Sequence, residues 1–257
     1  MSGIAALPPG ALRALFTSLL RRELATTAAA QRIIVISAIS VTAGVLAGSV
    51  EPLRQGDRPG LVDMLVGSYE QLAGFCIGLL AGSRFVASLH ADQRAGWLTQ
   101  LCAAGMRREW LVLLLAAATL AAAWLDYLGA LAAFGATHAA AAGAPPVARL
   151  VATVPGALLW MAAAMALAML LAILLNDRTR ARFALHTLLV APYVLGLLPL
   201  VAGDERPPTA IMRVAVRAVP FWSAPPSLAY ASYLLLYISV ALALALWLAP
   251  RRVERSV

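Results

Sequence analysis

Two carboxyl groups inside apolar runs are the side chains best placed to do chemistry. Glu70 and Asp126 each lie within a long apolar stretch of the sequence. A charge inside a bilayer costs about 3 kcal/mol or more unless it is paired or hydrated. Acids in such positions can line a translocation path, or they can hydrogen-bond to a neighbouring helix or lie close to the headgroups. Tyr69 and Tyr127 stand beside them and are typical of a membrane interface, which favours the second interpretation.

Motifs for catalysis are missing from the sequence. A P-loop needs a lysine after its glycine turn to hold phosphates, and all twenty basic residues here are arginine. His90, His138 and His186 are isolated in different segments, and no paired histidine or cysteine spacing suits zinc. No G-x-S-x-G nucleophile motif occurs either. We therefore predict that the chain is not an enzyme and has no catalytic residues, metal or cofactor of its own. A membrane transferase that uses dispersed carboxylates is the alternative.

Composition places these side chains in a membrane protein. Hydrophobic residues make up 62% of the 257 residues and charged residues only 12%, against about 25% charged in a typical soluble domain. A helix needs about 20 apolar residues to cross a bilayer. Six such stretches are expected, at about 33–50, 65–90, 110–134, 150–175, 183–202 and 228–248. The predicted fold is an all-α membrane protein with one domain, a six-helix bundle over 33–249.

The distribution of arginine sets the expected orientation. Most arginines lie in the N-terminal segment 1–32, the stretch 84–110, the turn 176–182 and the tail 250–257. By the positive-inside rule these four segments are cytoplasmic, so both termini lie inside. A net charge of +8 spread in this way marks topology and predicts no nucleic-acid partner. The expected surroundings are a lipid bilayer.

This topology gives each of the two acids a depth. Counted along a helix, Glu70 lies about 21 Å beyond Arg84, and Asp126 lies about 25 Å beyond Glu109. The sequence therefore predicts that both acids belong to the outer half of the membrane.

Two amphipathic segments are expected outside the bundle. Leucines and Phe16 follow one face of residues 1–32, opposite arginines, as in a connecting helix that lies in the headgroup region. Residues 203–227 contain five prolines and a short amphipathic stretch. This second pattern predicts an outer re-entrant segment that dips into the membrane.

A short polar segment between the second and third apolar runs is the centre of the sequence pattern. It reads RFVASLHADQRAGWLTQLCAAGMRREW over residues 84–110, and it is too short and too polar to cross a bilayer. Asp92 is predicted to cap the start of a helix, and Gly105 to close that helix about three turns later. The apolar side chains fall on one side of it: Trp97, Leu98, Leu101 and Cys102.

Glycines at four-residue spacing predict close helix contacts. Gly74, Gly78 and Gly82 lie on one face of the second expected span, and Gly44 and Gly48 repeat the spacing in the first. Packing within one chain is the simpler explanation of this pattern. A seam between two copies of the chain is the alternative.

The segment ADQRAGWLTQLCAAGMRREWLVL resembles the stretch that follows the second span in ABC-2 type transporter permeases. An acidic residue, a glycine, a spaced leucine pair, a turn and an arginine-rich restart of the third span recur in that family. The matching positions here are Asp92, Gly96, Leu98 with Leu101, Gly105, and Arg107 with Glu109. Permeases of this family usually have a proline near the position of Gly105, so the turn departs from the pattern.

The wider layout is also similar to that of ABC-2 permeases. It has an amphipathic connecting helix, six spans and a proline-containing outer segment around VPFWSAPP at 219–226. Residues 21–24 are similar to the LRREL-like start of the haem-exporter-type permeases of cytochrome c maturation.

The resemblance implies the membrane subunit of an ATP-binding cassette exporter in a prokaryotic inner membrane. The chain would pair with a second copy or a paralogue, and each half would dock a separate ATPase subunit that binds ATP and Mg²⁺. The elbow at 91–107 would be the docking lever, with the coupling residues Asp92, Arg94, Trp97, Leu98, Leu101, Gly105 and Arg107. The alternatives are a non-transporting anchor or scaffold subunit and a secondary transporter, although no inverted repeat indicates the latter.

Overall fold

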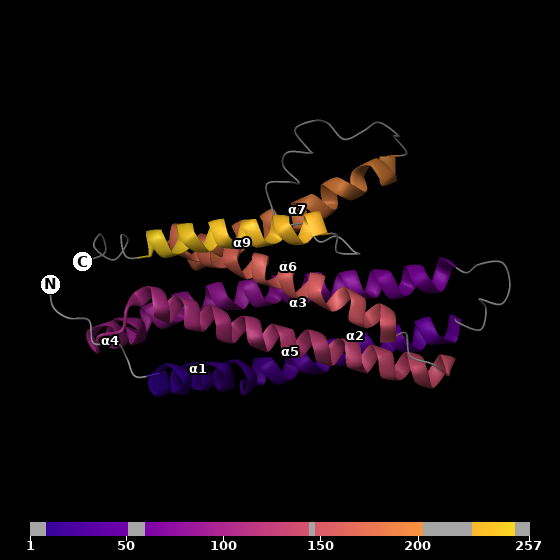
Figure 1. Cartoon of the computed structure of the whole chain (residues 1–257), viewed down its shortest axis with the longest axis horizontal. Coiled ribbons are helices and arrows are strands. Elements are labelled where there is room, and N and C mark those ends of the chain that lie inside the picture. Colours follow the sequence, from indigo (N-terminus) through magenta and orange to yellow (C-terminus); the bar gives the residue numbers. More distant parts are fainter. Residues whose placement is uncertain (1–8, 51–59, 144–146, 203–227, 250–257) are drawn as a thin grey trace.

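The computed structural model describes residues 9–50, 60–143, 147–202 and 228–249, and every regular element in these ranges is a helix (Figure 1). The helices are α1 (Pro9–Leu24), α2 (Thr27–Val50), α3 (Gly60–Arg94), α4 (Trp97–Ala103), α5 (Arg108–Ala142), α6 (Val147–Leu174), α7 (Arg178–Ala202) and α9 (Leu228–Leu248). The predicted all-α class is confirmed. The predicted outer segment 203–227 and tail 250–257 lie outside the described residues.

Five helical segments are long and apolar enough to cross a membrane. They are Ala29–Ser49, Leu72–Arg94, Arg108–Ala142, Leu150–Leu174 and Leu228–Leu248. Their length and composition are those of a multi-pass membrane protein. They overlap five of the six expected spans. The remaining expected span, 183–202, falls on α7 and is not among the five, so the count of six is not confirmed.

The long helices run roughly along one axis, and α4 lies at one end of them (Figure 1). We call this end of the bundle the elbow end. Helices α3 and α5 have 35 residues each and are joined there by α4. Helix α6 packs against α3 and α9, and α2 packs against α5. The turn after α6 also lies at the elbow end, because the His90 ring nitrogen Nε2 is 3.3 Å from the carbonyl oxygen of Leu175.

Helix α1 packs its apolar face on the protein. Leu19 is 3% exposed, and Leu12, Leu15 and Phe16 pack partly buried against the core. The apolar face of α1 therefore packs on α5, and the location of this helix in the headgroup region stays a prediction. Helix α2 follows α1 directly. The Thr26 hydroxyl caps its start by accepting a hydrogen bond of 3.1 Å from the Ala29 amide.

The glycines of α3 lie against other helices of the same chain. A Cβ at Gly78 would lie 2.2 Å from ring carbon Cζ3 of Trp160 on α6, and a Cβ at Gly82 would lie 3.0 Å from Leu185 on α7. Gly74 is buried on the same helix. Packing within one chain therefore accounts for Gly78 and Gly82.

Close packing at glycines also joins α2 to α5. A Cβ at Gly44 would lie 2.6 Å from the carbonyl oxygen of Phe134, and one at Gly48 would lie 2.9 Å from the carbonyl oxygen of His138. A carbonyl group of a helix backbone cannot move aside as a flexible side chain can. This seam therefore requires residues without a side chain.

Tyr69 ties three helices together inside the bundle. Its hydroxyl donates a hydrogen bond of 2.6 Å to the Ser40 hydroxyl on α2, and its ring stacks on Phe134 of α5 with centroids 4.2 Å apart. Tyr69 is 8% exposed and Tyr127 is 0% exposed. The expectation that these two tyrosines belong to an interfacial belt is wrong, because both lie in the core.

Two glycines in the left-handed conformation bound the elbow helix α4. Gly96 has φ 72° and Gly105 has φ 93°. The Gly105 amide donates to the Cys102 carbonyl at 3.0 Å, and the Met106 amide donates to the Leu101 carbonyl at 3.1 Å. This pair of bonds is the Schellman cap of a helix C-terminus. The prediction that Gly105 closes the helix is confirmed.

The predicted cap at the other end of the elbow helix is wrong. Helix α3 continues through Asp92 to Arg94, and α4 starts after Gly96 without a side-chain cap. The break between the two helices comes from the left-handed conformation of Gly96, which glycine adopts without steric cost. The Asp92 carboxylate is used elsewhere, in an ion pair with α1.

A Gly105→Ala substitution tests the conformational requirement of the elbow. A Cβ there meets nothing within 4 Å, so the penalty comes from the positive φ and should be about 1 kcal/mol. We expect faster amide hydrogen exchange in α4. Gly129→Ala on α5, where a Cβ also meets nothing within 4 Å, is the control and should be neutral or stabilising. Equal protection of α4 in both variants would contradict the prediction.

Candidate functional site

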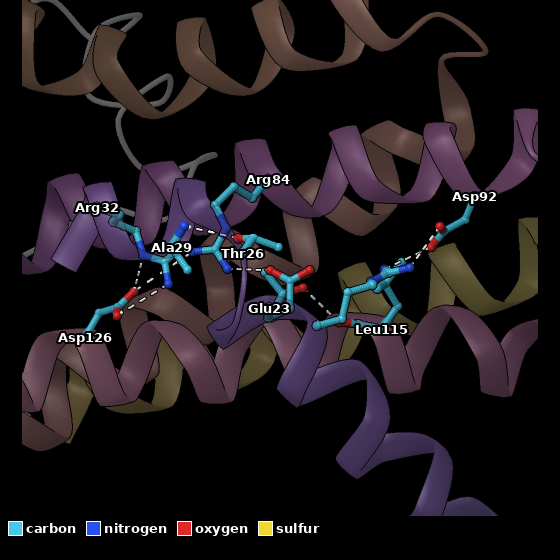
Figure 2. Close-up of polar contacts among 10 residues, drawn as sticks. Glu23, Thr26, Ala29, Arg32, Arg84, Asp92, Leu115 and Asp126 are labelled. Atoms are coloured by element: carbon cyan, nitrogen blue, oxygen red, sulfur yellow. Dashed lines mark hydrogen bonds and ion pairs between the residues drawn. The ribbon is translucent and has the colours of Figure 1, made fainter.

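Charged side chains from four helices meet part-way along the bundle in an ion-pair cluster, which consists of Glu23, Arg32, Arg84 and Asp126 (Figure 2). Arg84 of α3 pairs with Glu23 of α1, and its Nη1 lies 3.9 Å from Oδ2 of Asp126 on α5. Arg32 of α2 brings its Nε to 2.6 Å from the same Asp126 oxygen. The contacts therefore join α1, α2, α3 and α5.

The ion-pair cluster is largely removed from solvent. The side chains of Asp126 and Glu23 are 4% and 7% exposed, and those of Arg32 and Arg84 are 10% and 25% exposed. Burying an ion costs several kcal/mol, which pairing must offset. Two acids and two arginines balance in formal charge. Loss of one member would therefore leave a buried charge uncompensated.

The ion-pair cluster corrects the depth expected for Asp126. Arg84 was placed by its sequence at the cytoplasmic elbow and Asp126 in the outer half of the membrane, yet the two contact each other and share one level. Helices of 35 residues are about 50 Å long, and the hydrocarbon core is about 30 Å thick. A distance counted from a helix end therefore does not give depth. Asp126 is paired with arginine, and the side chain of Glu70 on α3 lies outside the described residues.

A second charged contact, the elbow clamp of Arg22, Asp92 and Trp97, fixes the elbow to α1. Both terminal nitrogens of Arg22 donate to the two carboxylate oxygens of Asp92, each at 3.0 Å. The Arg22 guanidinium carbon also lies 5.8 Å from the centroid of the Trp97 ring. Bidentate pairing and cation–π contact both orient a guanidinium. The clamp therefore holds α1 at the junction between α3 and α4.

The apolar face of α4 packs on the chain itself. Leu98 is 4% exposed, and Trp97, Leu101 and Cys102 pack partly buried against the core. Leu98 therefore does not offer its side chain to a partner, which corrects the expected docking face. The exposed residues of the elbow are Ala91, Arg94, Ala95, Thr99, Gln100, Ala103, Ala104, Gly105 and Arg107.

Truncation of Leu98 separates the two possible roles of this face. We expect Leu98→Ala to destabilise the protein by about 2 kcal/mol, because it removes buried methyl groups and leaves a cavity. Thermal unfolding in detergent, followed by circular dichroism, measures the loss. Gln100→Ala, on the exposed side of the same helix, should change stability by no more than about 0.5 kcal/mol. Equal stability of the two variants would show that Leu98 is not part of the core.

A groove of about 640 Å³ opens beside the ion-pair cluster, between α1, α2 and α3. Arg22, Arg32 and Arg84 line one part of it. Val35 and Leu80 line another part and are 57% and 46% exposed. The groove therefore combines guanidinium groups with an apolar surface.

Helix α7 is tied to α3 close to the ion-pair cluster. The Arg182 Nε donates to the Ser83 hydroxyl on α3 at 2.8 Å. Asp177 caps the start of α7 by accepting the Arg180 amide at 2.8 Å, and this bond lowers the pKa of Asp177 below its ordinary value. A movement of α3 would therefore reach α7 through a direct contact.

The members of the ion-pair cluster other than Asp126 did not stand out in the sequence. Arg32 and Arg84 count there only as topology markers at the borders of apolar runs. The available signal was Asp126 itself, because an acid inside a membrane span requires a partner. Arginines at the borders of the neighbouring spans are the natural candidates, but the sequence does not say which spans are neighbours.

No protein-family model matches the chain, and no curated protein matches it. The functional interpretation therefore rests on the geometry of the elbow end and on the resemblance of the elbow segment.

Proposed function

We propose that the chain is the membrane subunit of an ABC-2 type exporter, in which α4 receives the movement of a separate ATPase. The observation that carries this proposal is the construction of the elbow. A short helix bounded by two positive-φ glycines joins the two 35-residue helices α3 and α5 directly and is clamped to α1 by Arg22 and Asp92. Its outward face carries Arg94, Thr99, Gln100 and Arg107.

The mechanism is that of a lever. A force on α4 acts on α3 and α5 together, because neither helix is interrupted between the elbow and its far end. The ion-pair cluster passes the movement to α1 and α2, and the Arg182–Ser83 contact passes it to α7. ATP drives such a change only if the ATPase binds two arrangements of the bundle with different affinity.

The energy source is a partner chain in this proposal. The sequence has no lysine for a P-loop, so ATP and Mg²⁺ belong to the ATPase. In this proposal the elbow end and both termini lie in the cytoplasm, as the positive-inside rule predicts from the arginines. The chain lies in the inner membrane of a prokaryote, as the resemblance implies. A second copy or a paralogue of the chain completes the translocation path.

Purification from the native membrane tests the proposal. The tagged chain, extracted in a mild detergent, should bring an ATPase with it, measured as Mg-ATP hydrolysis in the purified complex. Thr99→Trp combined with Gln100→Trp alters only exposed positions of α4 and should reduce the recovered hydrolysis by about tenfold. Thr179→Trp, exposed in the first turn of α7 at the same end, is the matched control and should retain it.

Other outcomes separate the alternatives. Full hydrolysis with the double tryptophan variant would show that α4 is not the docking surface. Recovery of a partner without a P-loop would favour a non-transporting anchor. Substrate transport by vesicles of the purified complex that continues without ATP would contradict the exporter and favour a secondary transporter.

A further inference from the structure

The groove beside the ion-pair cluster changes from polar to apolar along its length. On α3 its lining residues Asp92, Ser88, Arg84 and Leu80 follow at four-residue intervals, which places them on one helix face. On α2, Arg32 comes first, and Val35 and Ile36 follow further from the elbow end. Both helices therefore pass from charged to apolar side chains in the same direction.

On α2 this change follows the start of the apolar span. The apolar span of α2 begins at Ala29, so Arg32 lies about 5 Å along the helix from that boundary, and Val35 lies about 9 Å from it. A long arginine side chain can reach from such a depth to the headgroups. Val35 and Leu80 are both exposed, so they offer an apolar surface on which an acyl chain can lie.

The charged end of the groove suits an anion. The side chains of Arg22 and Arg84 are partly exposed. Arg22 pairs with one carboxylate and Arg84 with two, and the five N–H donors of a guanidinium exceed what these contacts use. Phosphate oxygens match the fork of the guanidinium and form short, charge-assisted hydrogen bonds with it. Three arginines line the groove against two acids, Glu23 and Asp92, and Asp126 behind the lining balances the third charge. The groove therefore offers an anion unused N–H donors rather than a net positive charge.

We infer that the groove binds an anionic phospholipid of the surrounding membrane. The phosphate contacts Arg22 and Arg84, and one acyl chain lies on Leu80 and Val35. The bound lipid bridges α1, α2 and α3 next to the elbow clamp, so it stabilises the arrangement that holds the elbow. This inference does not rest on the proposed function, because any membrane role of the chain leaves the groove in contact with lipid.

Titration of the full chain in phosphatidylcholine nanodiscs tests the inference. Phosphatidylglycerol, added as the probe and counted by native mass spectrometry, should bind about tenfold more tightly than phosphatidylcholine with the same acyl chains. Glycerol phosphate, which has the anionic head without the acyl chains, should bind at least about tenfold more weakly than phosphatidylglycerol.

Two pairs of variants locate the site. Leu80→Trp should fill the apolar end and weaken phosphatidylglycerol binding about tenfold, whereas Leu72→Trp, at a 60% exposed position of the same helix, should leave it unchanged. Arg22→Gln should weaken binding about tenfold, and Arg21→Gln, the neighbouring charge outside the groove, by less than about twofold. Leu80 and Leu72 are both exposed, so neither tryptophan should disturb folding, which circular dichroism checks.

Three results would overturn the inference. Equal affinity for the two phospholipids would show that the anionic headgroup does not contribute to binding. Equal effects of Leu80→Trp and Leu72→Trp would place the lipid outside the groove. If glycerol phosphate binds as tightly as the lipid, the groove is a site for a free phosphate compound and not for a phospholipid.

Discussion

Asp126→Ala should destabilise the bundle by about 3 to 5 kcal/mol, the largest effect that we expect from a single substitution in this chain. The Asp126 side chain is 4% exposed and lies next to both Arg32 and Arg84. Arg84 keeps Glu23 when Asp126 is lost, but the guanidinium of Arg32 loses the carboxylate that it contacts at 2.6 Å. Denaturant unfolding in detergent micelles, followed by circular dichroism, measures the loss.

Two further variants show whether the loss comes from the buried pair. Glu109→Ala removes an acid whose partner Arg107 is 57% exposed, so it should cost no more than about 1 kcal/mol. Asp126→Leu combined with Arg32→Met removes both charges, and such apolar replacement of a buried pair is often close to neutral. This double variant should therefore be more stable than Asp126→Ala. Equal losses from Asp126→Ala and Glu109→Ala would refute the ion-pair cluster.

Gly78→Leu should separate α3 from α6 and cost about 3 kcal/mol, the upper part of the range for overpacking. Even a Cβ at this position would lie 2.2 Å from the Trp160 ring. Trp160 is 0% exposed, and its ring packs on Phe75 with centroids 5.4 Å apart, so it has no free space to enter. The same unfolding measurement reports the effect, and loss of the monodisperse peak in size-exclusion chromatography would accompany it.

A control variant and a double-mutant cycle test the contact between Gly78 and Trp160. Gly129→Leu on α5 adds the same side chain at an exposed glycine where a Cβ meets nothing within 4 Å, and it should be neutral. In a double-mutant cycle, Gly78→Leu should cost less when Trp160→Ala is already present, because the added side chain then enters the vacated space. Identical effects of the two leucines would mean that α3 and α6 do not meet at Gly78.

Features set by short stretches of sequence could be predicted. The helical class and five membrane-crossing segments follow from the length of the apolar runs, since a spanning helix must be about 20 residues long. The end of the elbow helix at Gly105 follows from a local need for positive φ, which glycine meets without strain. In both cases the information lies within one turn or one span.

Features set by contacts between helices could not be predicted. The apolar face of α1 would suit a lipid surface or a protein surface equally, and only the position of α5 decides that Leu19 is buried. Leu98 has the same ambiguity on α4. An acid inside an apolar span, such as Asp126, requires a partner. Its partners Arg32 and Arg84 lie 94 and 42 positions away in sequence, and no local pattern identifies them.

Photo-crosslinking from the exposed face of the elbow tests the central proposal most directly. A benzophenone amino acid in place of Gln100, irradiated in native membranes, should form an adduct with a P-loop ATPase that mass spectrometry identifies. The adduct yield should change when ATP is added, because the lever moves between two arrangements. The same amino acid in place of Thr179 should give a clearly lower yield. An adduct only with lipid, or only with a protein that has no P-loop, would contradict the proposal that the elbow couples this chain to an ATPase.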